Sequence, residues 1–127
     1  MSVGDNKRII ERLLREVFNT GDVARLGEFL SPELEASGRE YIQERRRLFP
    51  DLHYSTDEQI AEGDKVVTRG TMRGTNLGAL HDGRPATGRP MSTSVVFICR
   101  IEGAKVVDLW MLIDHLSVRE QLGIDRH

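Results

Sequence analysis

The stretch KVVDLWMLIDHLSVREQLG, residues 105–123, decides how the second half of this chain folds. It begins as a nearly continuous apolar run, which predicts a strand over residues 105–114 that ends at the acid Asp114. Because side chains alternate along a strand, Trp110 and Leu112 are expected to share one face with Asp114, while the other face is wholly apolar. A strand that is apolar on both faces is typical of burial on both sides. An acid at the end of such a strand calls for a physical reason.

Three more strand-like runs precede this stretch and follow a helical first half. The alternating apolar pattern predicts strands over residues 52–61, 65–75 and 91–101. The sequences EGDK at residues 62–65 and IEGAK at residues 101–105 indicate tight hairpin turns. The residues between the second and third runs, 76–90, are rich in Gly and Pro and predict a loop.

Cross-strand pairing provides a check on the first hairpin. If residues 63–64 form a two-residue turn, Glu58 lies opposite Arg69 and Tyr54 lies opposite Arg73. Both pairs are favourable, and they give Arg69 a structural role as one half of an ion pair on the sheet.

The first half of the chain carries apolar residues at helical spacing. A first helix is predicted with Asp5 as its N-cap and a glycine after its end, and Asp22 is expected to cap a second, short helix that stops before Pro32. A third helix is predicted over residues 39–49, with a short extra strand near residues 33–36. Helices followed by an antiparallel meander predict an α+β fold, in which three N-terminal helices cover one face of the sheet.

Length, charge and cysteine content limit the class of protein. The chain has 127 residues, which predicts a single domain over residues 1–127, and its net charge of −2 argues against nucleic-acid binding. Its one cysteine, Cys99, excludes an internal disulfide and is expected to be buried. No signal-peptide core or membrane-length run is present, which predicts a soluble, cytoplasmic protein without membrane contact. The four histidines show no metal-ligand spacing, so no metal site is expected.

A curved sheet covered by helices encloses a concave space, and small-molecule sites are concave and largely apolar. If Asp114 points into that space, loss of hydration should raise its pKa toward the range useful for proton transfer. The alternative is structural, because Asp114 could cap a short helix formed by HLSVREQLG, residues 115–123. The second apolar face of the last strand predicts a homodimer joined through the sheet.

Six segments, in their order and spacing, resemble the SnoaL-like polyketide cyclases, a family within the nuclear transport factor two-like superfamily. They are EVFNTGDV (16–23), LFPDLH (48–53), AEGDKVVTRGTMRGT (61–75), ATGRPM (86–91), CRIEGAKVVDLW (99–110) and DHLSVREQLG (114–123). Together they extend over most of the chain.

The resemblance implies a cone-shaped α+β barrel with an internal pocket, no cofactor, and dimers built through the sheet. It also implies that Asp114 is the general acid/base of an intramolecular aldol closure. The ligand would be a small hydrophobic or aromatic compound that carries carbonyl groups. We expect Trp110, Leu112, Phe18 and Phe49 to bound its pocket.

The chain departs from the family pattern at two places. Asn76 stands where the family often has a histidine, and residues 31–40 form a shortened segment that lacks another. A group that polarises the substrate carbonyl must then be sought elsewhere, and the candidates are Arg100, Arg69, Thr71 and Tyr54. Arg69 and Asn76 are kept as substrate-binding candidates. The alternatives to a cyclase are a non-catalytic binding or accessory protein and an isomerase, hydrolase or hydroxylase on the same fold.

Overall fold

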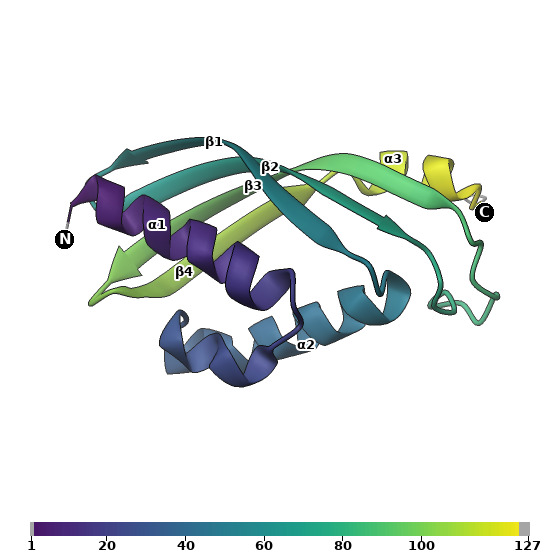
Figure 1. The fold of residues 1–127 in the computed structure, drawn as a ribbon, viewed down its shortest axis with the longest axis horizontal. Coiled ribbons are helices and arrows are strands. Elements are labelled where there is room, and N and C mark those ends of the chain that lie inside the picture. Colours follow the sequence, from purple (N-terminus) through teal and green to yellow (C-terminus); the bar gives the residue numbers. More distant parts are fainter. Residues whose placement is uncertain (1, 125–127) are drawn as a thin grey trace.

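The sheet is a four-stranded antiparallel meander, as the sequence predicts (Figure 1). The computed structural model describes residues 2–124. The strands, in their spatial order, are β1 (His53–Glu62), β2 (Lys65–Thr75), β3 (Pro90–Glu102) and β4 (Lys105–Ile113). The two predicted hairpin turns are present, and each contains a glycine with positive φ, Gly63 and Gly103, a conformation that other residues rarely adopt.

Three helical segments occupy the N-terminal part of the chain. Helix α1 (Val3–Leu13) continues into a π-helical turn, η1 (Leu14–Phe18), and a 3₁₀ segment, η2 (Val23–Glu28), leads to α2 (Pro32–Leu48). Figure 1 shows α1 and α2 on the same side of the curved sheet, and a short C-terminal helix, α3 (His115–Leu122), at one end of it. The predicted α+β architecture is confirmed.

Three details of the helical part differ from the prediction. Asp22 occupies the N-cap position of η2, but its side chain makes no capping hydrogen bond. The N-cap of α1 is Ser2, whose hydroxyl accepts a hydrogen bond from the backbone of Asp5 while the Asp5 carboxylate accepts one from Ser2. The non-helical segment and the short strand that were expected near residues 33–36 are absent, because α2 already begins at Pro32. Proline is well suited to the first turn of a helix, where its missing N–H costs nothing.

The register of β1 and β2 was predicted correctly only near the turn. Glu58 lies opposite Arg69, as expected, but Tyr54 lies opposite Met72 instead of Arg73. The reason is a bulge at Asp57, where one extra residue enters β1 and shifts every pairing beyond it. The shift places Tyr54 on the same face as Met72, and both side chains are buried.

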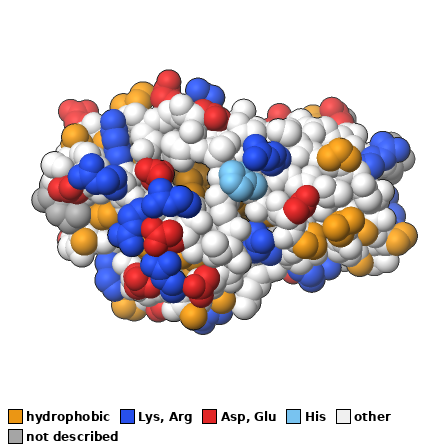
Figure 2. Space-filling model, in the orientation of Figure 1, with side chains coloured by type: hydrophobic (Ala, Val, Ile, Leu, Met, Phe, Trp, Pro, Cys, Tyr) orange, Lys and Arg blue, Asp and Glu red, His pale blue; other side chains and the backbone are white. Residues whose placement is uncertain are grey.

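The core lies between the helices and one face of the sheet, here called the inner face. On β2 and β3 this face is buried at every second residue, which is the alternation expected of a sheet covered on one side. Charged side chains of both signs are interleaved on the solvent-facing surface of the helices that cover the inner face (Figure 2). Among the described residues, no helix is long and apolar enough to cross a membrane.

Candidate functional site

The two residues expected to line an internal pocket from β4 lie on the outer face of the sheet. Trp110 is 52% exposed and Leu112 is 57% exposed. The inner face of β4 is formed instead by Leu109, Met111 and Ile113. The predicted placement of Trp110 and Leu112 beside an internal pocket is therefore wrong.

A bulge near the start of β4 explains this inversion. Val106 pairs with Ile101 and is fully buried, whereas Asp108 pairs with Arg100, which leaves Val107 as the extra residue. A bulge of one residue moves all later side chains to the opposite face. Val106 points inward, and simple alternation from it would place Trp110 and Leu112 inward as well. Because Val107 is an extra residue, both of these side chains point outward instead.

Asp114 follows β4 as the N-cap of α3. Its carboxylate Oδ1 accepts a hydrogen bond of 3.0 Å from the backbone N–H of Ser117, and the residue is exposed. Asp114 thus takes the capping position that the sequence left open as an alternative, and the expectation that it points into an apolar interior is wrong. Its part in catalysis stays a prediction.

The space between the helices and the inner face of the sheet is filled by the aromatic rings of Phe18, Tyr41, Tyr54 and Phe97, which we call the ring cluster. Phe18, which comes from the π-helical turn η1, packs its ring 5.5 Å from that of Tyr54 and 6.1 Å from that of Phe97. The Tyr54 hydroxyl lies 3.0 Å from the hydroxyl of Tyr41, which also donates to the sulfur of Met111 at 3.4 Å. Burial, reinforced by Tyr41, raises the pKa of Tyr54 far above its usual range, so this hydroxyl stays protonated at neutral pH.

A side-chain clamp holds Tyr54 in this position at the edge of the sheet. The amide of Asn19 accepts a 2.7 Å hydrogen bond from the backbone N–H of Tyr54 and donates a 2.9 Å bond to its carbonyl. Asn19 therefore replaces one residue of a neighbouring strand. It joins the end of η1 to β1, close to the ring cluster.

A cavity of about 320 Å³ lies at one end of the molecule, between the C-terminal part of α2, the loop after β2, and α3. We call it the end cavity. Its apolar lining consists of Leu48, Phe49, Leu80, Val118, Leu122 and Ile124. Of the four predicted pocket residues, Phe49 is the one that this cavity contains, and Phe18 belongs to the ring cluster.

Polar side chains also line the end cavity. They are Arg45 from α2, the predicted substrate-binding residue Asn76 together with His81, Asp82 and Arg84 from the loop, and His115 and Arg119 from α3. Arg84 forms an ion pair with Asp82 at 2.7 Å, and the ring Nδ1 of His81 lies 3.5 Å from Oε1 of Glu44. Apart from Asn76, sequence reasoning missed this group, because its members come from three segments that are distant along the chain.

Asn76 is fully buried and anchors the loop that borders the end cavity. Its amide nitrogen donates to the carbonyls of Leu48 and Gly78, and its Oδ1 accepts from the backbone N–H and the hydroxyl of Thr87. These four bonds give Asn76 a structural role, and they hold the loop against the end of α2.

Arg69, the other substrate-binding candidate, lies far from these groups in the fold. It is on the outer face of β2, and its guanidinium is 3.8 Å from the carboxylate of Asp57. The sequence predicted an ion pair on the sheet for Arg69, and the bulged residue Asp57 supplies the acid.

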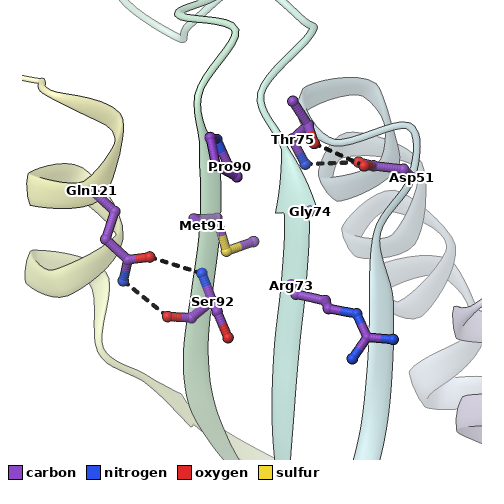
Figure 3. A pocket seen from close by; sticks show the side chains of 8 residues that line it. All are labelled: Asp51, Arg73, Gly74, Thr75, Pro90, Met91, Ser92 and Gln121. Carbon is purple, nitrogen blue, oxygen red and sulfur yellow. Dashed lines mark hydrogen bonds between the residues drawn. The ribbon is translucent and has the colours of Figure 1, made fainter.

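A second, shallower hollow of about 420 Å³ lies between the ends of β2 and β3 and α3 (Figure 3). At one side, the Asp51 carboxylate accepts bonds of 2.7 and 2.9 Å from the backbone and hydroxyl of Thr75, which lower its pKa. At the other side, the amide of Gln121 bonds both the N–H and the carbonyl of Ser92. These groups satisfy one another: the Gln121 bonds fasten α3 to β3, and the Asp51 bonds fasten the segment before β1 to the end of β2.

Metal chemistry has no candidate centre in residues 2–124, where no three His, Cys, Asp or Glu side chains converge. Cys99 is buried, and desolvation raises the pKa of its thiol to about 12. A thiol with that pKa is protonated at neutral pH and is a poor nucleophile.

The family profile described as SnoaL-like polyketide cyclase matches residues 8–122. The chain belongs to the SnoaL-like polyketide cyclase family. No curated protein matches it significantly.

Solved structures of similar proteins share the fold over nearly the whole chain. TsrD from Streptomyces laurentii is 28% identical, with a TM-score of 0.87, and the match covers 97% of this chain and 98% of TsrD. IdmH from Streptomyces antibioticus, a candidate polyketide cyclase, is 25% identical with a TM-score of 0.84, over 94% of this chain and 99% of IdmH. AclR from Streptomyces galilaeus, a candidate hydroxylase, is 24% identical with a TM-score of 0.85, over 96% of this chain and 83% of AclR.

Proposed function

We propose that this SnoaL-like protein binds a small, largely apolar carbonyl compound in the end cavity and catalyses its intramolecular aldol-type closure without a cofactor. The observation that carries the proposal is the end cavity itself, with its apolar lining and its group of titratable side chains, on a chain that belongs to a cyclase family. A site of this kind orients a flexible substrate, which contributes greatly when both reacting groups are on one molecule.

Asp114 is the proposed general acid/base. A carboxylate removes the proton from a carbon between two carbonyls, the enolate attacks a carbonyl of the same molecule, and the acid returns the proton to the new alkoxide. Asp114 directly precedes His115, which lines the end cavity. The proposal requires that the substrate reach the Asp114 carboxylate at the start of α3, where it is exposed and accepts a hydrogen bond from Ser117.

A second candidate function is the binding of a small molecule without chemistry. It is favoured by the hydrogen bond from Ser117 to Asp114, because a carboxylate that caps a helix already has a structural role. The ring cluster around Phe18 and Tyr54 also fills the interior in which family-type chemistry was expected.

Two substitutions of Asp114 separate the acid/base from the cap. Asparagine caps a helix about as well as aspartate but cannot accept the proton, whereas alanine does neither. Asp114→Asn should lower turnover of a polyketide-like β-keto ester by about 10²–10⁴-fold, the usual range for a positioned acid/base. Its melting temperature should stay close to that of the parent, while Asp114→Ala should also lose about 0.5–2 kcal/mol of stability.

The outcomes choose between the two functions. Undiminished turnover in Asp114→Asn removes Asp114 from the mechanism. Binding of the ester without turnover by the parent protein supports the non-catalytic candidate instead. In that case Asp114→Ala should still lower the melting temperature, because the cap exists whether or not the protein is an enzyme.

We also propose that two copies associate through the outer face of the sheet. The strand register places Ile60, Val67, Ile98 and Trp110 side by side across all four strands, and we call these residues the apolar row. Ile60 is 61% exposed, and Leu112 lies next to the row on β4. A second copy offers the same apolar surface, and a stable interface buries at least about 1,000 Å² in total.

Sedimentation tests this association. The parent chain should sediment as a dimer at micromolar concentration, and Trp110→Glu should shift it to monomer, because it puts an unpaired charge into the contact. Arg39→Glu, which introduces the same residue on the exposed side of α2, should leave the dimer intact. A parent chain that sediments only as monomer would sink the proposal.

A further inference from the structure

The end cavity combines an apolar lining with an excess of positive charge. Three arginines, one aspartate and two histidines are among its lining residues: Arg45, Arg84, Arg119, Asp82, His81 and His115. Arg45 and Arg84 alone outnumber Asp82, so the lining has a positive balance before the histidines are counted. A cavity with this chemistry favours a ligand that has an apolar body and a negative group.

The lining cations differ in how far they are already neutralised. The guanidinium of Arg84 is 2.7 Å from the carboxylate of Asp82. The ring of His81 is 3.5 Å from Glu44, whose carboxylate also accepts a 2.6 Å bond from Arg47. These contacts orient the loop groups and reduce the charge that they offer to a ligand.

Arg45 is different, because no carboxylate within residues 2–124 lies within ion-pair distance of it. Its guanidinium carbon lies 5.1 Å from the centre of the Tyr41 ring, a cation–π contact. The side chain is half-buried, and it lines the end cavity as well as a neighbouring hollow that contains His81 and Glu44. Its N–H groups make no hydrogen bond to another group within residues 2–124, so they stay available to a planar anion.

We propose that the ligand of the end cavity carries a free carboxylate in addition to its reacting carbonyl or ester groups, and that Arg45 binds this carboxylate while the apolar body packs on Phe49 and Leu122. This inference rests on the proposed function, since it names the chemical class of the compound that the same cavity takes. Guanidinium and carboxylate match in geometry and form two parallel hydrogen bonds, which a neutral ester cannot reproduce. The preference for the acid over its ester is thus a property that Arg45 confers.

A pair of probes isolates the charge. Titration calorimetry with 2-naphthoate and with its methyl ester compares two ligands that have the same aromatic body. The full-length parent protein should bind the acid at least about 10-fold more tightly than the ester, because a hydrogen bond to a charged group is stronger than one to a neutral group.

Variants of α2 assign the preference to one side chain. Arg45→Gln should weaken binding of the acid by about 10–100-fold and change binding of the ester little. Arg45→Lys keeps the charge without the planar fork and should recover part of the loss. Arg39→Gln removes the same charge from an exposed site on the same helix, and it should leave both affinities unchanged. Melting temperatures verify that every variant is folded.

The results separate this inference from the proposed cyclisation. Equal affinity for acid and ester, or an Arg45→Gln variant that binds the acid as the parent does, would overturn the carboxylate assignment and leave cyclisation open to its own test. A preference for the acid that depends on Arg45, in a protein without turnover, would support the assignment and reject the enzyme. Failure of both probes to bind at millimolar concentration would overturn the assignment, since the cavity would then hold no ligand of this class.

Discussion

The two faces of the sheet differ in what covers them, although both are rich in apolar side chains. The inner face packs against α1 and α2, and Phe97 on β3 is 2% exposed. The outer face carries the apolar row, in which the very next residue, Ile98, is 38% exposed and Trp110 is 52% exposed. Hydrophobic patterning therefore reveals that a strand has two apolar faces, but it does not reveal which face is buried. The helices that pack on the sheet determine which face becomes the core.

Two bulges determine which side chains of the edge strands β1 and β4 face inward. Asp57 in β1 turns Tyr54 inward, and Val107 in β4 turns Trp110 outward. Each bulge adds a single residue, and everything beyond it changes face. The two central strands contain no such shift between them, and their pairing is continuous from Lys65 to Thr75.

The largest expected effect is the difference in unfolding free energy between alanine substitutions at two neighbouring residues that lie on opposite faces of the sheet. Phe97→Ala should lower the free energy of unfolding by about 3–5 kcal/mol, because it empties space in the ring cluster. Ile98→Ala should cost less than about 1 kcal/mol, since its side chain is partly in water already. Urea denaturation of both variants measures the difference.

The protein concentration serves as the control for that pair. Both variants are compared at a dilution at which sedimentation shows monomer, so that a contribution from a second copy does not enter the result. Equal losses for Phe97→Ala and Ile98→Ala would show that the outer face is covered within the monomer, contrary to the structure.

The strands and turns were predictable because their signals are local. Alternating apolar residues and the glycines of two tight turns define β1 to β4 within one or two residues. The start of α2 was missed because Pro32 was taken to end a helix, although proline is equally at home in the first turn of the next one. Local patterns thus predicted the architecture and misjudged a boundary.

The candidate site was predictable only in part. Phe49 and Asn76 were expected at a pocket and line the end cavity, but Arg45, His81 and His115 were not expected there. They meet because the end of α2, a loop and α3 converge in space, and no pattern along one segment contains that information. Trp110 was misplaced for a different reason, because a strand that is apolar on both faces gives no sign of a bulge at Val107.

A medium effect is expected at the clamp that joins the first helical segment to β1. Asn19→Ala should lower the free energy of unfolding by about 1–3 kcal/mol, because it leaves a partly buried N–H and carbonyl of Tyr54 without partners. Asn19→Asp keeps the acceptor and loses the donor, so it should fall between the parent and Asn19→Ala. Chemical denaturation of the three proteins provides the measurement.

Hydrogen exchange tests whether the clamp acts locally on β1. If the clamp fixes the inward position of Tyr54, hydrogen exchange of the β1 amides should accelerate in Asn19→Ala more than exchange in β3. Uniform acceleration across the sheet would mean that Asn19 contributes to global stability only and does not hold the bulged edge strand in place.

The smallest effect is expected on the helical side of the molecule, where charged groups lie in water. Glu16 on η1 accepts hydrogen bonds from Arg12 at 2.8 Å and from Arg25 at 2.9 Å, and these bonds lower its pKa to about 2. A carboxyl whose pKa is lower in the folded state stabilises the protein above the unfolded pKa, and this contribution is lost as the pH falls. The melting temperature of Glu16→Gln should therefore lie slightly below that of the parent from pH 5 to 8, the difference should shrink below about pH 4.5, and it should vanish near pH 2.

Glu40→Gln, which removes an exposed carboxylate from α2 that has no ion pair within residues 2–124, should follow the parent at every pH. A difference for Glu16→Gln that persists at pH 2 would show that the side chain acts through packing on this covered side of the sheet and not through its charge.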